Sequence, residues 1–600
     1  SLGANAEVAG NVDVNDNVTL ASAVTLTTTN SGAVDFAGTV NGAQNLTLAA
    51  AGATVFNGTV GNSAPLGTGT GAGLTINSAG TTSFENTLAT ASGVVQDNAA
   101  GAVTFKGDVT IAAGNTATTL NGNVVLDGLT FNAGAASTFG NAGTDTITLS
   151  TAAAIISDTN NAGVTVNSKV DGAQAFTVNS TGAVALNGLI GSGTPIASLT
   201  SNTGGTLSLG ANAIVAGNVD VNDNTTLTAP VSLTTSAGGT IDFAGTVDGS
   251  QDLTVASAGT TTFNGNVGSG TALGDGTGAS VTINSTGLTR FAGTLQTDSG
   301  LTGTGSVRFD DAVTLAAGNT ATTLNGDVTL DGLTFNSAGN VTLGDATSDT
   351  LTISTAAVTV KTPGATLNIP SNAVINDGLV LTLGDGGATA IIAGGTISGQ
   401  ASANSDLVVN TTGTAAFNGI IGGGSQFRNL TITQSGGTTF GAAVTSTGGT
   451  VLLTATTGTI EFDGALVAPT LTTAAQGYAL NLDGGSTIAN AVTMSNTGAV
   501  RIGDGADTNT FTGGLTATAP SGLSVAGNIV ATNQAISLGD GGTALTLTAD
   551  TDVSAGNGVI TLGGAVDGAY GLTLTTTGTA NVDGVVGAST PITSLTSNTG

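Results

Sequence analysis

The sequence contains no cysteine, no histidine and no tryptophan among its 600 residues, and aromatic residues make up only 3% of it. Without cysteine there is no disulfide framework and no thiolate ligand for a metal ion. Without histidine there is no imidazole ligand and no catalytic triad with a histidine base. The complete lack of cysteine fits an exported bacterial surface protein.

Charge is scarce and mostly of one sign. Only 7% of the residues are charged, with 7 basic against 37 acidic residues and a net charge of −30. Nucleic acids and anionic membranes both attract lysine and arginine, so we expect neither as a partner. Of the acidic residues, 34 are aspartates, which turns favour. Apolar runs stay short of the roughly 18 residues of a membrane span, so we expect no membrane insertion in this region.

Short runs of alternating apolar and polar residues fill the chain. "NLTLAA" (Asn45–Ala50) and "TITLST" (Thr146–Thr151) are typical, and Asn-Gly or Asp-Gly pairs often end such runs. Alternation with period two predicts β-strands, and the glycines and β-branched residues disfavour helices. The sequence therefore predicts an all-β protein.

A Phe-x-Gly-x-Val phrase recurs along the sequence. It occurs at Phe36–Val40, Phe56–Val60, Phe243–Val247 and Phe263–Val267. Most neighbouring copies follow at intervals of roughly 18 to 28 residues, and repeats at such intervals indicate a solenoid. In a solenoid each turn needs its neighbour to bury its core. We predict a parallel β-helix of about 20 residues per turn, with these phenylalanines stacked inside. A β-propeller fits less well, because its blades need about 40 residues.

A longer repeat lies over the short one. Residues 1–61 match residues 208–268 without a gap, with about two thirds of positions identical. Residues 171–204 likewise match residues 567–600. We expect one continuous β-solenoid over residues 1–600, with long repeats at about 1–207, 208–357 and 358–600. Because both ends fall inside a repeat, we expect the chain to be a fragment of a longer repeat protein.

Runs such as "GAVDFAGTVNGAQNLTL" (Gly32–Leu48) and "GTTTFNGNVGSGTALG" (Gly259–Gly274) resemble the filamentous-haemagglutinin-like adhesins of two-partner secretion and the autotransporter-type giant β-repeat adhesins. The resemblance covers essentially the whole chain. It implies a right-handed parallel β-helix that is exported through an outer-membrane secretion partner. It also implies an extracellular or outer-surface location on a Gram-negative-type bacterium, with a role in adhesion, aggregation or matrix.

Isolated Gly-Asp-Gly phrases are the candidate metal sites. Carboxylate and carbonyl oxygens at tight turns suit calcium, but calcium β-rolls repeat their nonapeptide in direct succession. The Gly-Asp-Gly phrases do not follow one another in direct succession, so an Asx-type turn is the competing interpretation. The weak calcium candidates are Asp275, Asp385, Asp504 and Asp540.

Close aspartate pairs raise the question of an enzyme, since two carboxylates that face one cleft can cleave polysaccharides. The pairs are Asp13 with Asp16, its copy Asp220 with Asp223, and Asp310 with Asp311. Residues three apart in a strand point to opposite faces, and the duplication of the first pair favours a structural role. The seven basic residues are scattered along the sequence. We therefore expect no enzyme, no catalytic residues and no cofactor-binding residues.

Threonine-rich runs at Thr25–Asn30 and Leu572–Thr579 suggest an ice-binding face. That chemistry needs Thr-x-Thr at the same place on every turn, and the uneven turn lengths predict that the pairs drift. A β-branched residue on an outer strand face explains threonine as well.

The expected function is a secreted or cell-surface fibrous protein with a structural and adhesive role, as an adhesin, filament, sheath or biofilm matrix component. Its expected partners are other copies of itself, and surface glycans or other cells. The alternatives are a polysaccharide-binding or polysaccharide-cleaving β-helix enzyme, and an ice-binding or calcium-dependent repeat adhesin.

Overall fold

The computed structural model describes residues 1–97, 101–158, 160–202, 204–318, 320–400, 402, 404–423 and 427–599. Gly600, the last residue of the predicted solenoid, lies outside this part. The described chain is all-β, and its parallel strands form about 26 turns of a β-solenoid. The predicted parallel β-helix is confirmed. The chain divides into two compact units, Ser1–Asp298 (unit 1) and Ser299–Gly600 (unit 2).

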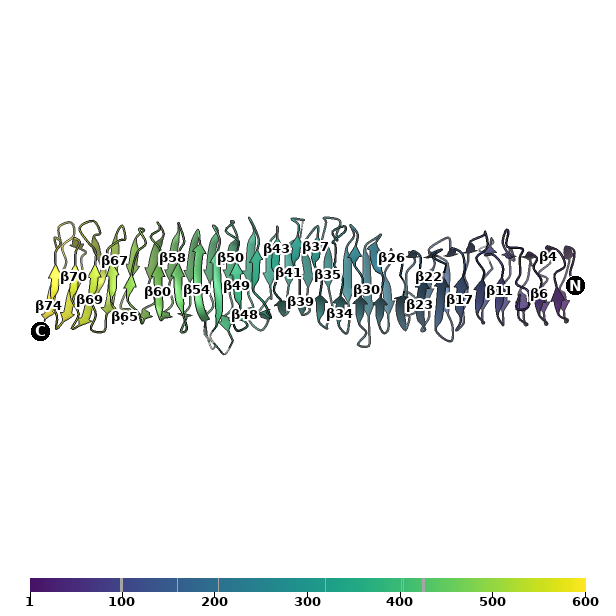
Figure 1. Ribbon diagram of the computed structural model, residues 1–600, viewed down its shortest axis with the longest axis horizontal. Coiled ribbons are helices and arrows are strands. Elements are labelled where there is room, and N and C mark those ends of the chain that lie inside the picture. Colours follow the sequence, from purple (N-terminus) through teal and green to yellow (C-terminus); the bar gives the residue numbers. More distant parts are fainter. Residues whose placement is uncertain are drawn as a thin grey trace. The chain divides into compact units, whose positions relative to one another are not determined.

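Most turns of unit 1 contribute one strand to each of three faces, and at Val60, Ile190 and Val267 a single bridge residue takes the place of a strand. Figure 1 shows strands of successive turns side by side. Face A contains β1 (Ala6–Val8), β4 (Val24–Thr28), β7 (Leu46–Ala49), β9 (Leu74–Ile76), β12 (Val94–Gln96), β15 (Thr118–Leu120), β18 (Ser137–Phe139), β21 (Val164–Val166), β24 (Val184–Leu186), β26 (Thr206–Leu209), β29 (Asn224–Leu227), β32 (Val247–Asp248) and β37 (Leu295–Thr297).

Faces B and C complete each turn of unit 1. Face B contains β2 (Val12–Val14), β5 (Val34–Phe36), β8 (Thr54–Phe56), β10 (Thr82–Phe84), β13 (Val103–Phe105), β16 (Val124–Leu126), β19 (Thr146–Leu149), β22 (Lys169–Asp171), β27 (Ala213–Val215), β30 (Val231–Thr235), β33 (Leu253–Ala256) and β35 (Val281–Ile283). Face C contains β3 (Val18–Thr19), β6 (Val40–Asn41), β11 (Leu88–Thr90), β14 (Val109–Ile111), β17 (Thr130–Ala133), β20 (Ala154–Asp158), β23 (Ala175–Ser180), β25 (Ser198–Asn202), β28 (Val219–Val221), β31 (Ile241–Phe243), β34 (Thr261–Phe263) and β36 (Thr289–Phe291).

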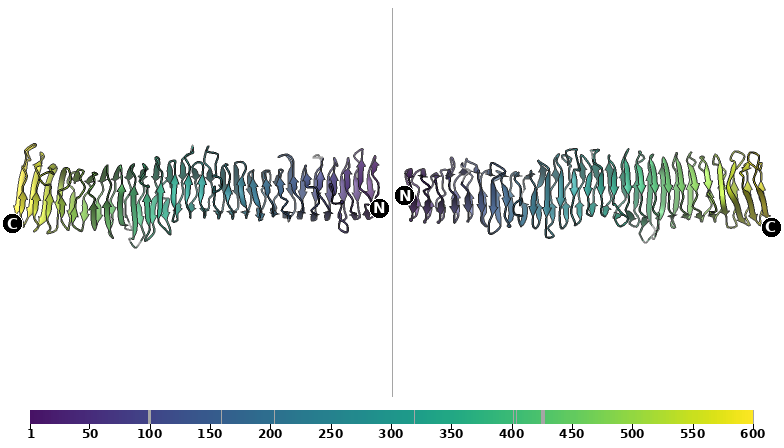
Figure 2. Two further views of the ribbon diagram at one scale, coloured as in Figure 1. Left: turned by 45° about the horizontal axis from the view of Figure 1, so that its top comes forward. Right: turned by 180° about the vertical axis from the view of Figure 1, so that it is seen from behind.

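Unit 2 is built in the same way, and both views of Figure 2 show its strands in parallel rows. Face D contains β38 (Leu301–Gly303), β41 (Thr322–Leu324), β44 (Val341–Leu343), β47 (Thr366–Ile369), β50 (Ala390–Ala393), β53 (Thr414–Phe417), β55 (Gly437–Phe440), β58 (Thr459–Phe462), β61 (Ala479–Leu482), β64 (Val500–Ile502), β67 (Leu523–Val530), β69 (Leu545–Gly556) and β71 (Val566–Asp567).

The long strands β67 and β69 also extend into face E of unit 2. Face E further contains β39 (Val307–Phe309), β42 (Val328–Leu330), β45 (Thr350–Ile353), β48 (Asn372–Ile375), β51 (Ile397–Gly399), β56 (Val444–Thr445), β59 (Leu466–Ala468), β62 (Ser486–Ile488), β65 (Thr508–Phe511), β72 (Gly571–Thr576) and β74 (Ser594–Thr599). Face F contains β40 (Val313–Leu315), β43 (Thr334–Ser337), β46 (Val358–Lys361), β49 (Val380–Leu383), β52 (Ser405–Asn410), β54 (Phe427–Gln434), β57 (Thr450–Leu453), β60 (Thr470–Thr473), β63 (Val492–Thr493), β66 (Leu515–Ala517), β68 (Ile536–Leu538), β70 (Ile560–Leu562) and β73 (Ala580–Val582).

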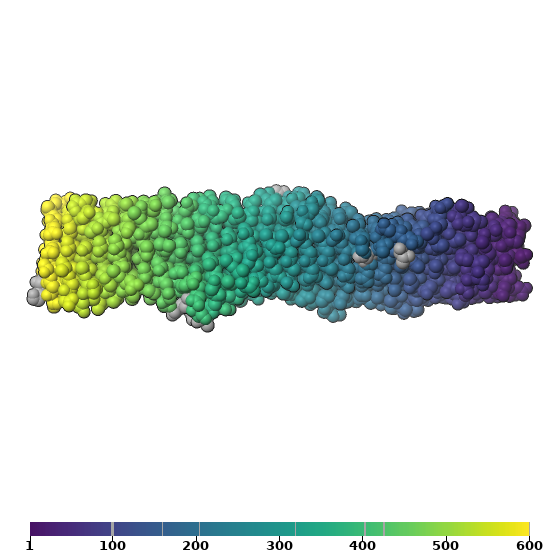
Figure 3. Space-filling model, in the orientation of Figure 1, coloured from purple at the N-terminus to yellow at the C-terminus, as the bar shows by residue number. Residues whose placement is uncertain are grey.

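The repeated phenylalanines stack inside the coil, as the sequence predicts. Phe36, Phe56, Phe243 and Phe263 are at most 1% exposed. The rings of Phe36 and Phe56 lie 4.9 Å apart and nearly parallel, and those of Phe243 and Phe263 lie 5.2 Å apart. Each alternating strand places its apolar residues in this core and its polar residues outside. The space-filling view shows the side chains of successive turns packed along the visible surface of each unit (Figure 3).

The average turn has about 22 residues, slightly more than predicted, because extra residues lie in the corners. Phe56 pairs with Phe36 on one side and with Phe84 on the other, although Phe84 is the more distant of the two in the sequence. The longer turn has a loop after Gly61, whose φ of 71° is a conformation that favours glycine. A Cβ at Gly61 would lie 2.0 Å from the carbonyl oxygen of Ala89. Insertions at corners therefore leave the stacking of the strands unchanged.

Candidate functional site

Asparagine and aspartate side chains at the corners bind the backbone of the next turn. The Asn17 side-chain oxygen accepts a hydrogen bond from the Thr39 backbone N–H at 2.9 Å. The equivalent Asn224 accepts one from the Thr246 N–H at 3.0 Å. Each bond satisfies a backbone donor that a sharp corner leaves without a strand partner. These side chains hold the turns together.

Aspartate performs the same task as asparagine. Asn41 accepts a hydrogen bond from the Ser63 N–H at 2.9 Å. Its counterpart in the second copy of the long repeat is Asp248, which accepts one from the Gly270 N–H at 2.7 Å. Further aspartates with this role are Asp108, Asp127, Asp171, Asp327, Asp331, Asp550 and Asp567. Many of the acidic residues thus stabilise the corners.

Most of the few basic side chains form ion pairs with acids of a neighbouring turn. Arg428 donates to both carboxylate oxygens of Asp406, at 3.0 and 2.6 Å. Lys106 lies 2.7 Å from Glu85. The other pairs of this kind are Arg308 with Asp331, Lys361 with Asp385, and Arg501 with Asp483. These cations serve contacts within the chain.

The densest group of acids among the described residues lies on face D. Oxygens of Glu461 on β58, Asp463 just after it and Asp483 just after β61 lie within 4.8 Å of one another. Arg501 on β64 donates to Asp483 and, at 3.1 Å, to Glu461. The Asn481 amide also donates to Glu461, at 3.1 Å. The guanidinium spans two turns and neutralises part of this acidic cluster.

The electrostatics of the acidic cluster follow from this packing. Burial raises the pKa of Asp463, and repulsion from Glu461 and Asp483 raises it further. The hydrogen bonds with Asp483 raise the pKa of Arg501, because they favour its charged form. Three carboxylates at this spacing have the oxygen chemistry of a hard-cation site. Arg501 already supplies a positive charge there.

Two of the calcium candidates form Asx-type turns. The Asp275 carboxylate accepts hydrogen bonds from the backbone N–H and the hydroxyl of Thr277, at 2.8 and 2.7 Å. Asp540 accepts bonds from the N–H groups of Gly542 and Thr543, at 2.7 and 2.9 Å. These bonds lower the pKa of both aspartates, because they favour the ionised carboxylate. Calcium binding by either residue stays a prediction.

The other two candidates lie beside further charged residues. Asp385 accepts a hydrogen bond from the Gly387 N–H at 3.1 Å and lies 3.2 Å from the Lys361 ammonium group. The pKa of Asp504 is raised by its side-chain interaction with Asp507, which favours the protonated carboxyl group, and by burial. Within the described chain, none of the four candidates belongs to the acidic cluster of face D.

The close aspartate pairs differ in their surroundings. Asp220 is partly exposed on face C, whereas Asp223 is 2% exposed and accepts a hydrogen bond from the Ser201 hydroxyl. This matches the expectation that residues three apart point to opposite sides. In the third pair, Asp310 binds the Arg308 guanidinium, and Asp311 accepts from the backbone N–H that follows it, at 2.7 Å. In the first pair, Asp13 and Asp16 are both exposed.

Threonines of face A form a column, although the turns differ in length. Thr25 pairs with Thr47, and Thr47 pairs with Thr75. The column continues through Val95, Thr119, Thr138 and Thr165. Single threonines stay in register along this column, because the corners absorb the extra residues, whereas the Thr-x-Thr pairs are not kept from turn to turn, as the sequence predicts. The second threonine of Thr25-x-Thr27 is not repeated, since Thr27 pairs with Ala49.

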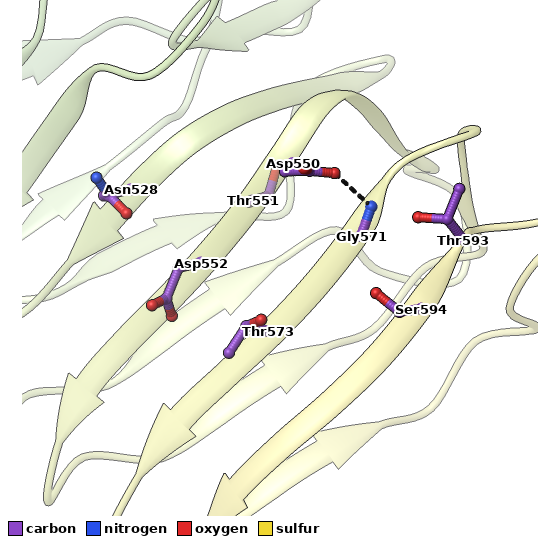
Figure 4. Close-up of a pocket in the computed structure, with 8 residues that line it drawn as sticks. All are labelled: Asn528, Asp550, Thr551, Asp552, Gly571, Thr573, Thr593 and Ser594. Carbon is purple, nitrogen blue, oxygen red and sulfur yellow. Dashed lines mark hydrogen bonds between the residues drawn. The ribbon is translucent and has the colours of Figure 1, made fainter.

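A polar hollow of about 350 Å³ lies on the outer surface of unit 2 (Figure 4). Figure 4 shows Asp550 and Asp552 on β69, with the Asp550 carboxylate directed at the Gly571 N–H, 2.8 Å away. The Asp552 carboxylate accepts a hydrogen bond from the Thr575 hydroxyl at 3.3 Å. Hydroxyl, amide and carboxylate groups line the hollow, which is the chemistry that can bind a sugar.

Reasoning from sequence missed the acidic cluster and the polar hollow. The residues of the cluster occur in "EFDG", "NLDGG" and "RIGDG" on three separate turns, so only their register brings them together. In the described part of the chain, no helix is long and apolar enough to span a membrane. No protein-family model, curated protein or solved structure matches the chain. The fold is that of a β-helical repeat protein.

Proposed function

We propose that this chain is part of a fibrous extracellular protein with a structural and adhesive role. One observation carries the proposal: many acidic side chains and most basic ones are engaged in joining turns. The corner aspartates accept backbone hydrogen bonds, and five basic residues pair with acids of their own unit. A solenoid of this kind supplies length and repeated outer surfaces.

Self-association through these outer surfaces is the proposed activity. The net charge of −30 keeps copies apart at low ionic strength. Salt of about 0.1 M screens charges beyond about 10 Å, so it favours lateral contact between copies. Bundled copies would form a filament, sheath or biofilm matrix, and attachment to cells or glycans would follow.

The proposed setting is the outer surface of a Gram-negative-type bacterium, reached with an outer-membrane secretion partner. The likeness to filamentous-haemagglutinin-like and autotransporter-type adhesins supports it. We propose no enzymatic activity and no nucleic-acid partner. The low content of basic residues supports the latter.

Deletion of the gene tests the proposal. We expect the deletion to reduce cell aggregation, surface attachment and the number of thin extracellular fibres seen by negative-stain imaging. Purified protein should associate more strongly as salt is added. Unchanged aggregation and fibres in the deletion strain would overturn the proposal, as would polysaccharide turnover by the purified protein at enzymatic rates.

Polysaccharide binding is the second candidate, and the polar hollow of unit 2 favours it. Asn528, Asp550, Asp552 and Thr573 supply donors and acceptors on one outer surface. A neutral glycan should then bind the purified chain, and Asp552→Ala should weaken that binding. An Asp552→Ala variant with unchanged glycan affinity would remove this candidate.

A further inference from the structure

The long sequence repeat places equivalent residues on different faces of unit 1. Thr47 lies on β7 in face A, where it pairs with Thr25 and Thr75. Thr254, its equivalent in the second copy of the long repeat, lies on β33 in face B, where it pairs with Ser232 and Thr282. The same change from face A to face B holds for β1 and its equivalent β27.

The change of face follows from the number of turns in one long repeat. From β1, nine steps along face A lead to β26, and β27 is the next strand on face B. Since three strands make one turn, one long repeat corresponds to nine turns and one third of a turn. A surface feature that the repeat encodes is therefore copied about one third of the way around the coil.

One such feature is the threonine patch, a group of partly exposed residues on three successive turns. The first copy consists of Thr25, Thr27, Thr47, Ala49 and Thr75 on face A. The second copy consists of Ser232, Thr234, Thr254, Ala256 and Thr282 on face B. Between the two copies of the patch only Thr25 differs, and its equivalent is a serine that keeps the hydroxyl. By contrast, about a third of the aligned residues of the two long repeats differ.

Both copies of the patch lie on uncharged strands in an otherwise acidic unit. Residues 1–298 contain 18 acidic and 3 basic residues. The ten successive strands of face A from β4 to β29 contain no charged residue, and neither do the face B strands β27, β30, β33 and β35. Two acidic molecules repel each other least where such strands meet.

Another molecule of this same chain fits these strands better than other partners. Its threonine column has the same spacing, about 4.8 Å per turn, so hydroxyls of one copy can face those of the other. A hydroxyl both donates and accepts hydrogen bonds, which makes the patch complementary to itself. Ten strands of three residues cover about 48 Å by 10 Å. Two molecules that meet along these ten strands of face A bury about 1,000 Å², near the lower limit of specific interfaces, and the four uncharged strands of face B offer less than half of that area.

We propose that the two threonine patches are docking surfaces for other copies of this chain, and that they point in different directions. The inference rests on the proposed self-association and names its surfaces. One chain then contacts two others through two neighbouring faces, so the chains join into unbranched strings.

The test uses the full chain with one substitution in each patch: Thr47→Asp, Thr254→Asp, and both together. Sedimentation measures the average mass at about 0.15 M salt, where exposed charges are screened beyond about 8 Å. Negative-stain imaging shows the shape of the assemblies. We expect unbranched strings from the unchanged chain, pairs from each single variant, and monomers from the double variant.

Thr177→Asp is the matched control, because Thr177 is a partly exposed strand residue of face C. It should associate like the unchanged chain, and hydrogen exchange should show that all variants are folded. The inference is overturned if the double variant associates normally, if one single variant abolishes all association, or if the control fails as well. An unchanged chain that stays monomeric at every salt concentration would instead remove the self-association on which the inference rests.

Discussion

The two copies of the long repeat in unit 1, residues 1–61 and 208–268, have the same interior and different surroundings. Phe56 and Phe263 each lie between two stacked rings. Around them, Asn45 becomes Asp252, and Thr68, just beyond the aligned segment, becomes Asp275. The comparison shows that the stacked apolar residues inside the coil determine the fold, whereas residues at the corners can change charge without moving the strands.

The interior should respond most strongly to substitution. We expect Phe263→Ala to cost about 3–5 kcal/mol, because it opens a cavity between Phe243 and Phe291. Hydrogen exchange should accelerate in the neighbouring strands and stay slow around Phe56, since a solenoid turn couples mainly to its neighbours. The outward substitution Thr262→Ala is the control. Equal loss of protection in both copies would contradict this local behaviour.

The corner hydrogen bonds should have a smaller and equal effect in both copies. We expect Asn17→Ala and Asn224→Ala each to cost about 1 kcal/mol, because each leaves a backbone N–H without its acceptor. Asn224→Asp should cost less than Asn224→Ala, because the carboxylate can accept the same bond. Local hydrogen exchange measures all three variants. If Asn224→Asp lost as much local stability as Asn224→Ala, the side-chain hydrogen-bond acceptor would not be the cause of the loss.

The added aspartates should make the local stability of the second copy depend on pH, unlike that of the first copy. Burial raises the pKa of Asp252 above its ordinary value of 3.8, and Asp275 raises it further. The folded state thus holds this proton more tightly than the unfolded chain, so local stability increases as the pH falls through the raised pKa towards 3.8.

Asp252→Asn restores the residue of the first copy and should remove this pH dependence, with an effect below about 1 kcal/mol at neutral pH. Hydrogen exchange of the 274–280 loop between about pH 4 and pH 7 measures it. The loop after Leu66, which has Asn45 beside it, is the internal control. A pH dependence that survives in the variant would point to another group.

Calcium removal should have the smallest effect. The Thr277 backbone and hydroxyl already satisfy the Asp275 carboxylate, so we expect a chelator to leave local stability unchanged. Hydrogen exchange of both loops with and without chelator checks this. Opening of the Asp275 loop alone would establish a calcium site that the first copy, with Thr68, does not have.

The sequence by itself determined the secondary structure and the interior. Alternation with period two predicted the strands, and the spacing of Phe36, Phe56, Phe243 and Phe263 predicted the stacked core, because each turn must bury the same residue types as its neighbours. The expectation that Asp220 and Asp223 point to opposite sides agrees with their exposure, whereas Asp13 and Asp16, the copied pair, are both exposed.

Only the tertiary structure decided which surface residues lie together. Corners contain different numbers of residues, so spacing in the sequence does not give the position around the coil. The acidic cluster of Glu461, Asp463 and Asp483 under Arg501 depends on register across three turns. The threonine column of face A and its copy on face B depend on the same count of strands, because a residue's face is fixed by the number of corners before it and not by the number of residues.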